Sequence, residues 1–185
     1  MTLEVTTRIT AETYYQLPEY EHYNLIQLID GEVVIGMAAI PKHQTVVGNA
    51  HVMLWLSAKQ HGGKAFTSPI EVYLDQYNVY EPDVVYLAQN SRCVVEEKRL
   101  TGAPDLVVEV LSPSTAKVDR DKKFNAYQAH GVREYWIADP ANAYLEVWVL
   151  RDALFVKSGT FVAGDTFECA VLNGQVIQVG AIFEG

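Results

Sequence analysis

The chain has 185 residues, of which 49% are hydrophobic and 20% are charged. This length and composition predict one globular domain over residues 1–185 with a sizeable core, and they exclude a disordered chain. The 14 basic and 23 acidic residues give a net charge of −9, which argues against a protein that coats nucleic acid non-specifically but not against a nuclease with a local basic patch.

The first predicted elements are a short helix and a hairpin. Thr10 can cap a helix that ends near Leu17, because Pro18 follows it. Two apolar runs within residues 26–36 meet at Asp30-Gly31. Asp-Gly is a strong turn signal, so these runs predict two antiparallel strands.

A long helix and further strands are predicted in the middle of the chain. Residues 41–61 predict a helix that ends before two glycines. Residues 64–75 and 80–87 each read as one strand, with Asp83 at the beginning of the second. Residues 90–102 are polar and predict an exposed loop or short edge segment. The apolar stripe of the predicted helix at residues 41–61 consists of Val46, Val47, Ala50, Met53, Leu54 and Leu56.

A strand, a helix and a second strand form the most informative stretch. An almost continuous apolar run over residues 106–111 predicts a strand that is covered on both faces. Glu109 interrupts this run, and a carboxylate in a buried strand is costly unless it is paired or holds a metal. Ser112-Pro113-Ser114 ends the strand, a helix follows to about His130, and the second strand begins at Glu134.

The last part of the chain predicts β-structure. Residues 144–150 and 154–158 read as a hairpin, and short strands near Phe161, Phe167 and 176–179 end the sequence. Together the elements predict an α/β protein with a mixed β-sheet flanked by helices and with additional β-hairpins.

Asp83 and Glu109 are the first candidates for a functional site. Mg²⁺ prefers hard oxygen ligands, usually one or two carboxylates with water and substrate phosphate, and Mn²⁺ is the alternative ion. If their strands are neighbours, the two acids can hold such a metal, with the peptide carbonyl of Val110 as a further oxygen. Phosphodiester cleavage also needs a group that neutralises charge in the transition state, and Lys123 on the next helix is the candidate.

The helix around Lys123 carries further candidates. Asp119, Lys123 and Tyr127 are spaced i, i+4, i+8 and therefore share a face, where Tyr127 can pack and also hydrogen-bond near the site. Arg120 and Lys122 lie in the one clearly basic region and are candidates for substrate binding. A plainer interpretation stays open, in which the basic residues form a solvated helix face and Glu109 is a structural acid.

Several motifs resemble one known family. They are the hairpin LIDGE, a histidine at the start of the next helix, EPDVVYL, GAPDLVVEVLSPST, DRDKKFNAY and GVREYWIADP. Along nearly its whole length the chain is similar to the Uma-type restriction endonucleases of the PD-(D/E)XK nuclease superfamily. The resemblance implies a restriction-endonuclease-like fold and a metal-dependent endonuclease acting on nucleic acid, expected to be DNA. Cutting both strands of a duplex is simplest with two sites, so a homodimer is also expected.

The resemblance assigns roles residue by residue. The Pro-Asp of the superfamily corresponds to Pro82-Asp83, and its next acid corresponds to Glu109. The usual lysine position holds Leu111, which is a departure. In one branch the lysine has moved into the following helix, and similarity to that branch implies Lys123 as the migrated lysine.

Four other residues are candidates for accessory roles. Family members usually have Glu immediately before Leu-Ile-Asp-Gly, where this chain has Gln27. Gln27 lacks the charge of that Glu but keeps an oxygen. Glu32, just past the turn, is a weaker candidate to take the place of the missing Glu. His43 lies in the first turn of the second helix, where a lone histidine more often caps or packs than binds a ligand. Asp105 also follows a proline, but it lies roughly 13 Å from Glu109 by strand rise, too far for one metal, so it is assigned a capping or supporting role.

Three functions are compatible with these residues. The first is a metal-dependent endonuclease, and the second is a binding or interaction protein on the same fold with weakened or lost cleavage, which Gln27 and the acidic charge support. The third is a metal-dependent hydrolase with another kind of substrate.

No apolar run is long enough to span a bilayer, and MTLEVTTRIT does not resemble a secretory signal. We therefore expect a cytoplasmic protein with free thiols at Cys93 and Cys169.

Overall fold

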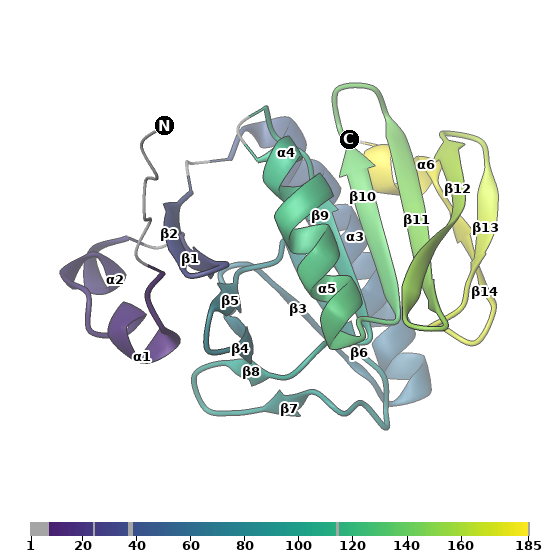
Figure 1. Cartoon of the computed structure of the whole chain (residues 1–185). Helices are drawn as coiled ribbons and strands as arrows, with labels where there is room; N and C mark the ends of the chain where they lie inside the picture. The colour runs from purple at the N-terminus through teal and green to yellow at the C-terminus, as the bar shows by residue number, and fades with distance from the viewer. Residues whose placement is uncertain (1–7, 24, 37–38, 114, 185) are drawn as a thin grey trace.

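The structure, a computed structural model, describes residues 8–23, 25–36, 39–113 and 115–184. Two six-stranded sheets and a two-stranded sheet pack with one long helix and several short ones (Figure 1). The helices are α1 (Ala11–Tyr14), α2 (Pro18–His22), α3 (Pro41–His61), α4 (Ala116–Val118), the π-helical turn η1 (Asp119–Lys123), α5 (Phe124–His130) and α6 (Gly180–Phe183). The strands are β1 (Ile26–Ile29), β2 (Glu32–Ile35), β3 (Lys64–Thr67), β4 (Val72–Asp75), β5 (Asn78–Tyr80), β6 (Val84–Leu87), β7 (Val94–Val95), β8 (Leu100–Thr101), β9 (Leu106–Val110), β10 (Glu134–Asp139), β11 (Tyr144–Arg151), β12 (Leu154–Val162), β13 (Thr166–Cys169) and β14 (Gln175–Gln178).

The central sheet has the strand order β12-β11-β10-β9-β6-β3. In this sheet β9 and β10 run parallel, and the other pairs are antiparallel. Every residue of β9 is buried, as its apolar run predicts. Val108 and Val110 pack in one core with α3, whereas Val107 packs in a second core with Tyr127 of α5. Since side chains alternate along a strand, Glu109 projects to the same side as Val107, towards α5.

The outer sheet has the order β2-β1-β5-β4-β8-β7. Its first two strands are the predicted hairpin, and the turn residues Asp30 and Gly31 have φ angles of 54° and 76°. These left-handed conformations are the ones that Asp-Gly accommodates well in a two-residue turn. The local chemistry of the turn therefore determined this hairpin.

Two segments that read as single strands are each divided in the structure. Residues 64–75 form β3 in the central sheet and β4 in the outer sheet, with Pro69 between them. Residues 80–87 contain the end of β5 and all of β6, with Pro82 between them. Because proline cannot donate a ladder hydrogen bond, both prolines lie where the chain passes from one sheet to the other. Asp83 consequently lies just before β6 and not within a continuous strand.

The predicted helices also differ in detail. Pro18 begins α2 and does not simply follow a helix end, which is consistent with the preference for proline in the first helical turn. The bounds of α3 are as predicted, but Leu56 is 52% exposed, because Leu54, Ser57 and Ala58 occupy the buried face there. The helix after β9 is interrupted by the π-helical turn η1. The short strands β7 and β8 lie within the predicted loop at residues 90–102, and α6 was not predicted.

The helices of the described chain are all too short or too polar to cross a lipid bilayer.

Candidate active site

Glu109, Lys123 and Tyr127 form a buried cluster between β9 and the helical segment that follows it. The Lys123 Nζ lies 2.9 Å from Glu109 Oε1, and the Tyr127 hydroxyl donates to the same oxygen at 2.7 Å. Glu109 and Lys123 are each only 3% exposed. Lys123 is therefore not part of a solvated helix face, and Glu109 has the paired environment that a buried acid requires.

Asp119 is a second acid beside the same ammonium. Its Oδ1 lies 3.2 Å from Lys123 Nζ, and the residue is 1% exposed. Asp119 and Lys123 are the two ends of η1, and both side chains are buried. Because π-helical turns occur frequently at functional sites, this local irregularity is consistent with a site here.

Asp83 joins the site from the other strand. In the β6–β9 pair Val84 faces Val108, so Asp83 comes next to Glu109 at the end of β9. Asp83 Oδ2 accepts a hydrogen bond from the Val110 amide at 2.7 Å. The condition that the two acidic strands are neighbours is therefore met.

The cluster contains more acids than cations. Burial raises the pKa of Glu109, the nearby charge of Lys123 opposes this shift, and the carboxylates of Asp119 and Asp83 reinforce it. Burial alone would lower the pKa of Lys123, but Glu109 and Asp119 outweigh that effect and hold the pKa above its usual value. Two carboxylates contact the one ammonium group and a third, that of Asp83, lies at the neighbouring strand position, an arrangement that an additional cation would stabilise.

The donor set is compatible with a hard divalent metal. No three His, Cys, Asp or Glu side chains group closely enough to form a complete metal site in the described part of the chain. Mg²⁺, however, is commonly bound by one or two carboxylates with waters. Glu109 makes its contacts through Oε1, and among the described residues its Oε2 accepts no hydrogen bond. Asp83 makes its contacts through Oδ2, and its Oδ1 likewise accepts none from these residues. Each acid therefore retains one oxygen that can bind a cation.

His43 contacts this pair of acids from the first turn of α3. Its Nε2 lies 3.5 Å from Asp83 Oδ2, and its Nδ1 is buried with no hydrogen-bond partner in the described residues. Burial lowers the pKa of His43, but Asp83 and the Val110 backbone outweigh this effect and raise it. His43 is thus a neighbour of Asp83 and not an isolated helix cap.

Gln27 and Glu32 have other contacts. Gln27 Oε1 accepts a hydrogen bond from the Glu81 amide at 3.0 Å. Glu32 forms an ion pair with Lys122 at 2.6 Å, with both side chains partly exposed. The oxygen of Gln27 therefore already accepts a hydrogen bond, and the charge of Glu32 is paired with Lys122.

Arg120 and Asp105 also have defined partners. Arg120 donates to Glu146 at 2.8 Å and to the Tyr144 hydroxyl at 2.9 Å. Asp105 accepts from the Ala88 amide at 2.9 Å and from Arg133 at 3.0 Å. The contacts of Asp105 are supporting ones that connect β9 to the ends of its neighbouring strands.

Glu81 is a half-buried acid, two residues before Asp83, that the sequence did not single out. Burial, with a further contribution from Glu71, raises the pKa of Glu81 to about 7, and the charge of Lys123 opposes this shift. Glu81 Oε2 is buried without a hydrogen-bond donor among the described residues. The sequence signal was only Glu-Pro-Asp, and nothing in that tripeptide indicates that an oxygen of the glutamate is buried.

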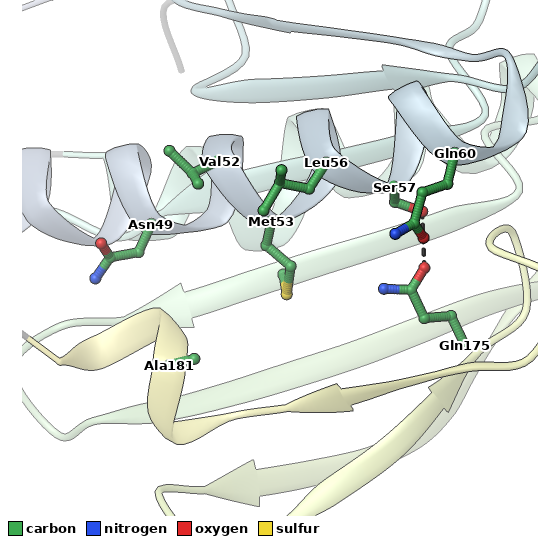
Figure 2. Close-up of a pocket in the computed structure, with 8 residues that line it drawn as sticks. All are labelled: Asn49, Val52, Met53, Leu56, Ser57, Gln60, Gln175 and Ala181. Carbon is green, nitrogen blue, oxygen red and sulfur yellow. Dashed lines mark hydrogen bonds between the residues drawn. The ribbon is translucent and has the colours of Figure 1, made fainter.

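The cluster is separate from two surface pockets. One has a volume of about 430 Å³ and lies between α3 and the C-terminal segment, where Ser57 donates to Gln175 at 2.8 Å (Figure 2). The other has a volume of about 470 Å³ and is lined by Tyr15, Tyr20, Glu71 and the β7–β8 turn. Neither pocket is lined by Asp83, Glu109 or Lys123, and the side chains of Glu109 and Lys123 are themselves buried.

Comparison with known proteins identifies the family. A family model described as "Uma2: Putative restriction endonuclease" matches residues 11–180. The chain belongs to this family. A relative from Synechocystis sp. (strain ATCC 27184 / PCC 6803 / Kazusa), "Uncharacterized protein sll1609", is 26% identical over 141 residues, which cover 75% of this chain and 80% of the relative.

A solved structure has the same fold as this Uma2 family member. It is described as a "putative nuclease belonging to DUF820" from Anabaena variabilis ATCC 29413 and superposes with a TM-score of 0.77 at 20% identity. The superposition covers 95% of this chain and 97% of the other. The predicted family and the predicted nuclease-like α/β fold are therefore confirmed.

Proposed function

We propose that this chain is a metal-dependent endonuclease that hydrolyses phosphodiester bonds in DNA. The observation that supports the proposal most strongly is the meeting of Asp83, Glu109 and Lys123, which lie far apart in the sequence, at the end of β9. Membership of a family described as restriction endonucleases supports the same reaction class.

In this proposal Mg²⁺ or Mn²⁺ is held by Asp83, Glu109 and the Val110 carbonyl. The excess of carboxylates over ammonium groups favours cation binding. When bound, such a metal supplies Lewis-acid stabilisation of a phosphoryl oxygen and lowers the pKa of a bound water. The roles of the protein groups follow from their positions around the two acids.

Lys123 is the proposed catalytic cation. Its ammonium is held by Glu109 and Asp119 in a site with almost no solvent access, where electrostatic interactions are stronger than in water. It can stabilise the negative charge that develops on the phosphate, and Tyr127 keeps Glu109 in place by donating to the same oxygen. His43 lies beside the Asp83 carboxylate and can support it.

Contacts to the DNA backbone are proposed for Lys122 and Arg120. Both residues lie in η1 beside Lys123. Lys122 is the more available of the two, because its partner Glu32 is itself partly exposed, whereas Arg120 is held by both Glu146 and Tyr144. A phosphate can replace Glu32 as the partner of Lys122, and this exchange predicts salt-dependent binding.

We also propose that the active form is a homodimer, because two sites related by a two-fold axis suit the two strands of a duplex.

A second candidate function is binding without efficient cleavage. Gln27 favours it, because the side chain at this position carries no charge and its oxygen is occupied by the Glu81 amide. Under this alternative the chain binds nucleic acid through the same face but turns over slowly.

Metal binding and cleavage distinguish these candidates. Calorimetry should show that Mn²⁺ binds the wild-type protein and that Glu109→Ala weakens binding by at least about 10-fold, the lower end for losing support at a metal site. Asp121→Asn, which changes an exposed acid on the same helical segment, is the matched control and should bind like wild type. Equal affinity in wild type and Glu109→Ala would exclude the proposed metal site.

Cleavage is then measured with plasmid and single-stranded DNA in the presence of Mg²⁺ or Mn²⁺. Conversion of plasmid that requires the metal and is lost in Glu109→Ala is the expected result. Metal-dependent DNA binding without any cleavage would favour the second function.

A further inference from the structure

We propose that Asp119 is a positioning residue that holds the Lys123 ammonium beside Glu109 while substrate is being cleaved. This inference rests on the proposed nuclease function and deepens it, because it assigns a separate role to an acid that is not among the proposed metal ligands. Asp119 acts through Lys123 and has no contact with the reacting atoms in this proposal.

The geometry places Lys123 between two carboxylates. Its Nζ lies 2.9 Å from Glu109 Oε1 and 3.2 Å from Asp119 Oδ1. Asp119 Oδ1 is completely enclosed and makes no hydrogen bond with good geometry to any described residue, so the ammonium is its charge partner. An enclosed carboxylate with so few donors costs stability. Its presence is explained if the position of Lys123 matters for function.

Asp119 is itself fixed to the central sheet. The buried Tyr135 hydroxyl of β10 donates to the Asp119 backbone carbonyl at 3.1 Å. The next residue, Arg120, is bound to Glu146 of β11. Two consecutive residues of η1 are therefore anchored to neighbouring strands, and the Asp119 carboxylate has a defined position relative to β9.

The Asp119 carboxylate matters because, in the proposed site, Glu109 interacts with both Lys123 and a bound cation. A cation and Lys123 would both draw on the negative charge of Glu109, so the attraction between Glu109 and Lys123 weakens when a cation is bound. Asp119 retains its charge for Lys123 alone. It can therefore keep the ammonium in place in the state in which the reaction occurs.

Asp121 provides a matched comparison within the same turn. It is an exposed aspartate that accepts a hydrogen bond from Asn125 at 3.2 Å, and no ion pair with Lys123 is present. Asp121→Asn removes the same charge from the same helical turn without changing the surroundings of Lys123.

The first experiment measures the kinetics of metal-dependent DNA cleavage. Asp119→Asn should lower kcat by about 10-fold to 100-fold, as loss of a supporting group around a functional side chain typically does. KM and the Mn²⁺ dissociation constant should stay within about twofold of wild type, and Asp121→Asn should match wild type throughout. An unchanged kcat in Asp119→Asn overturns the proposal. A loss of Mn²⁺ affinity as large as that of Glu109→Ala overturns it too, since Asp119 would then be a metal ligand.

The second experiment needs no cleavage. In protein labelled with ¹⁵N-lysine, the enclosed Lys123 ammonium should give a slowly exchanging Nζ signal, identified by its absence in Lys123→Gln. Asp119→Asn should shift or broaden this signal, whereas Asp121→Asn should leave it unchanged. A signal that is unaffected by Asp119→Asn overturns the positioning role.

The two experiments separate failure of this inference from failure of the proposed function. If wild-type protein does not cleave DNA but Asp119→Asn changes the Nζ signal, the nuclease proposal is wrong. The contact between Asp119 and Lys123 is then still shown to hold the ammonium in place. If wild-type protein cleaves and neither kcat nor the Nζ signal responds, the nuclease proposal stands and the positioning role is wrong. Should Asp119→Asn not fold, Asp119→Ser, which removes the charge without adding bulk, replaces it in both measurements.

Discussion

Lys122 and Lys123 are neighbours in the sequence with opposite surroundings. The Lys123 side chain is 4% exposed and lies between two buried acids, whereas the Lys122 side chain is 39% exposed and pairs with Glu32. Lys123→Ala should therefore lower kcat by about 100-fold or more, the lower end for losing one group that stabilises the transition state. Lys122→Ala should mainly weaken DNA binding and reduce its salt dependence, as loss of a phosphate contact does.

The comparison is made by metal-dependent cleavage and salt titration, with folding checked by circular dichroism. Lys123→Arg should restore little activity, because a planar guanidinium cannot place its charge where the compact ammonium was. An inactive Lys122→Ala beside an active Lys123→Ala would show that the roles of the two lysines are reversed.

At the scale of single elements, one glycine within the long helix α3 and another just after it have opposite environments. A Cβ built on Gly48 would have no atom within 4 Å, so Gly48→Ala should stabilise the protein by about 0.5–1 kcal/mol through its higher helix propensity. A Cβ on Gly63, just after the helix, would lie 2.5 Å from the Leu87 carbonyl oxygen of β6. Gly63→Ala should therefore destabilise the protein by about 1–3 kcal/mol, the range for overpacking.

Urea unfolding of the two variants measures both effects. A Gly63→Ala protein as stable as Gly48→Ala would mean that the contact between the end of α3 and β6 is looser than in this structure.

Glu71, which immediately precedes β4, should make stability depend on pH. Burial raises its pKa, while the neighbouring Tyr20 hydroxyl and the charge of Arg99 oppose the shift. The folded protein thus binds the Glu71 proton more tightly than the unfolded chain does. The stability from this group is greatest in acid and is lost as the pH rises from the unfolded pKa of about 4.3 through the raised folded value.

Glu71→Gln is neutral at every pH and isolates this effect. Its free energy of unfolding should approach that of wild type near pH 4 and exceed it at pH 8. Glu97→Gln, which changes an exposed acid at the same pocket, should show no such divergence. A constant difference between Glu71→Gln and wild type across this range would contradict the raised pKa.

At the scale of the whole molecule, the proposed homodimer predicts the pattern of DNA cleavage. Light scattering at micromolar concentration should give twice the mass of the chain, since two symmetric sites suit the two strands of a duplex. Plasmid should then pass from supercoiled to linear with little accumulation of nicked circles. A monomer mass together with nicked product would show that each molecule cuts one strand.

Local sequence patterns determined much of this protein. The Asp-Gly turn, the bounds of α3 and the buried strand β9 follow from turn chemistry and apolar periodicity, which act over a few neighbouring residues. The motifs from EPDVVYL to GVREYWIADP are enough by themselves to indicate the family, because they are short runs of adjacent residues. Glu109 was identified because an acid in an apolar strand requires a partner, and Asp83 was its candidate partner at the start of another predicted strand, where the family resemblance also pointed.

Only the tertiary structure decided how these parts meet. The segment from Lys64 to Asp75 is apolar enough for one strand, but its two ends pair with different sheets, a choice made by distant partners. The sequence placed Asp119 and Lys123 on one face, but it could not show that both are enclosed or that Lys123 lies between two acids. Burial of a charged group depends on what packs over it from elsewhere in the chain, and here Glu109 and the hydroxyl of Tyr135 come from two different strands of the central sheet.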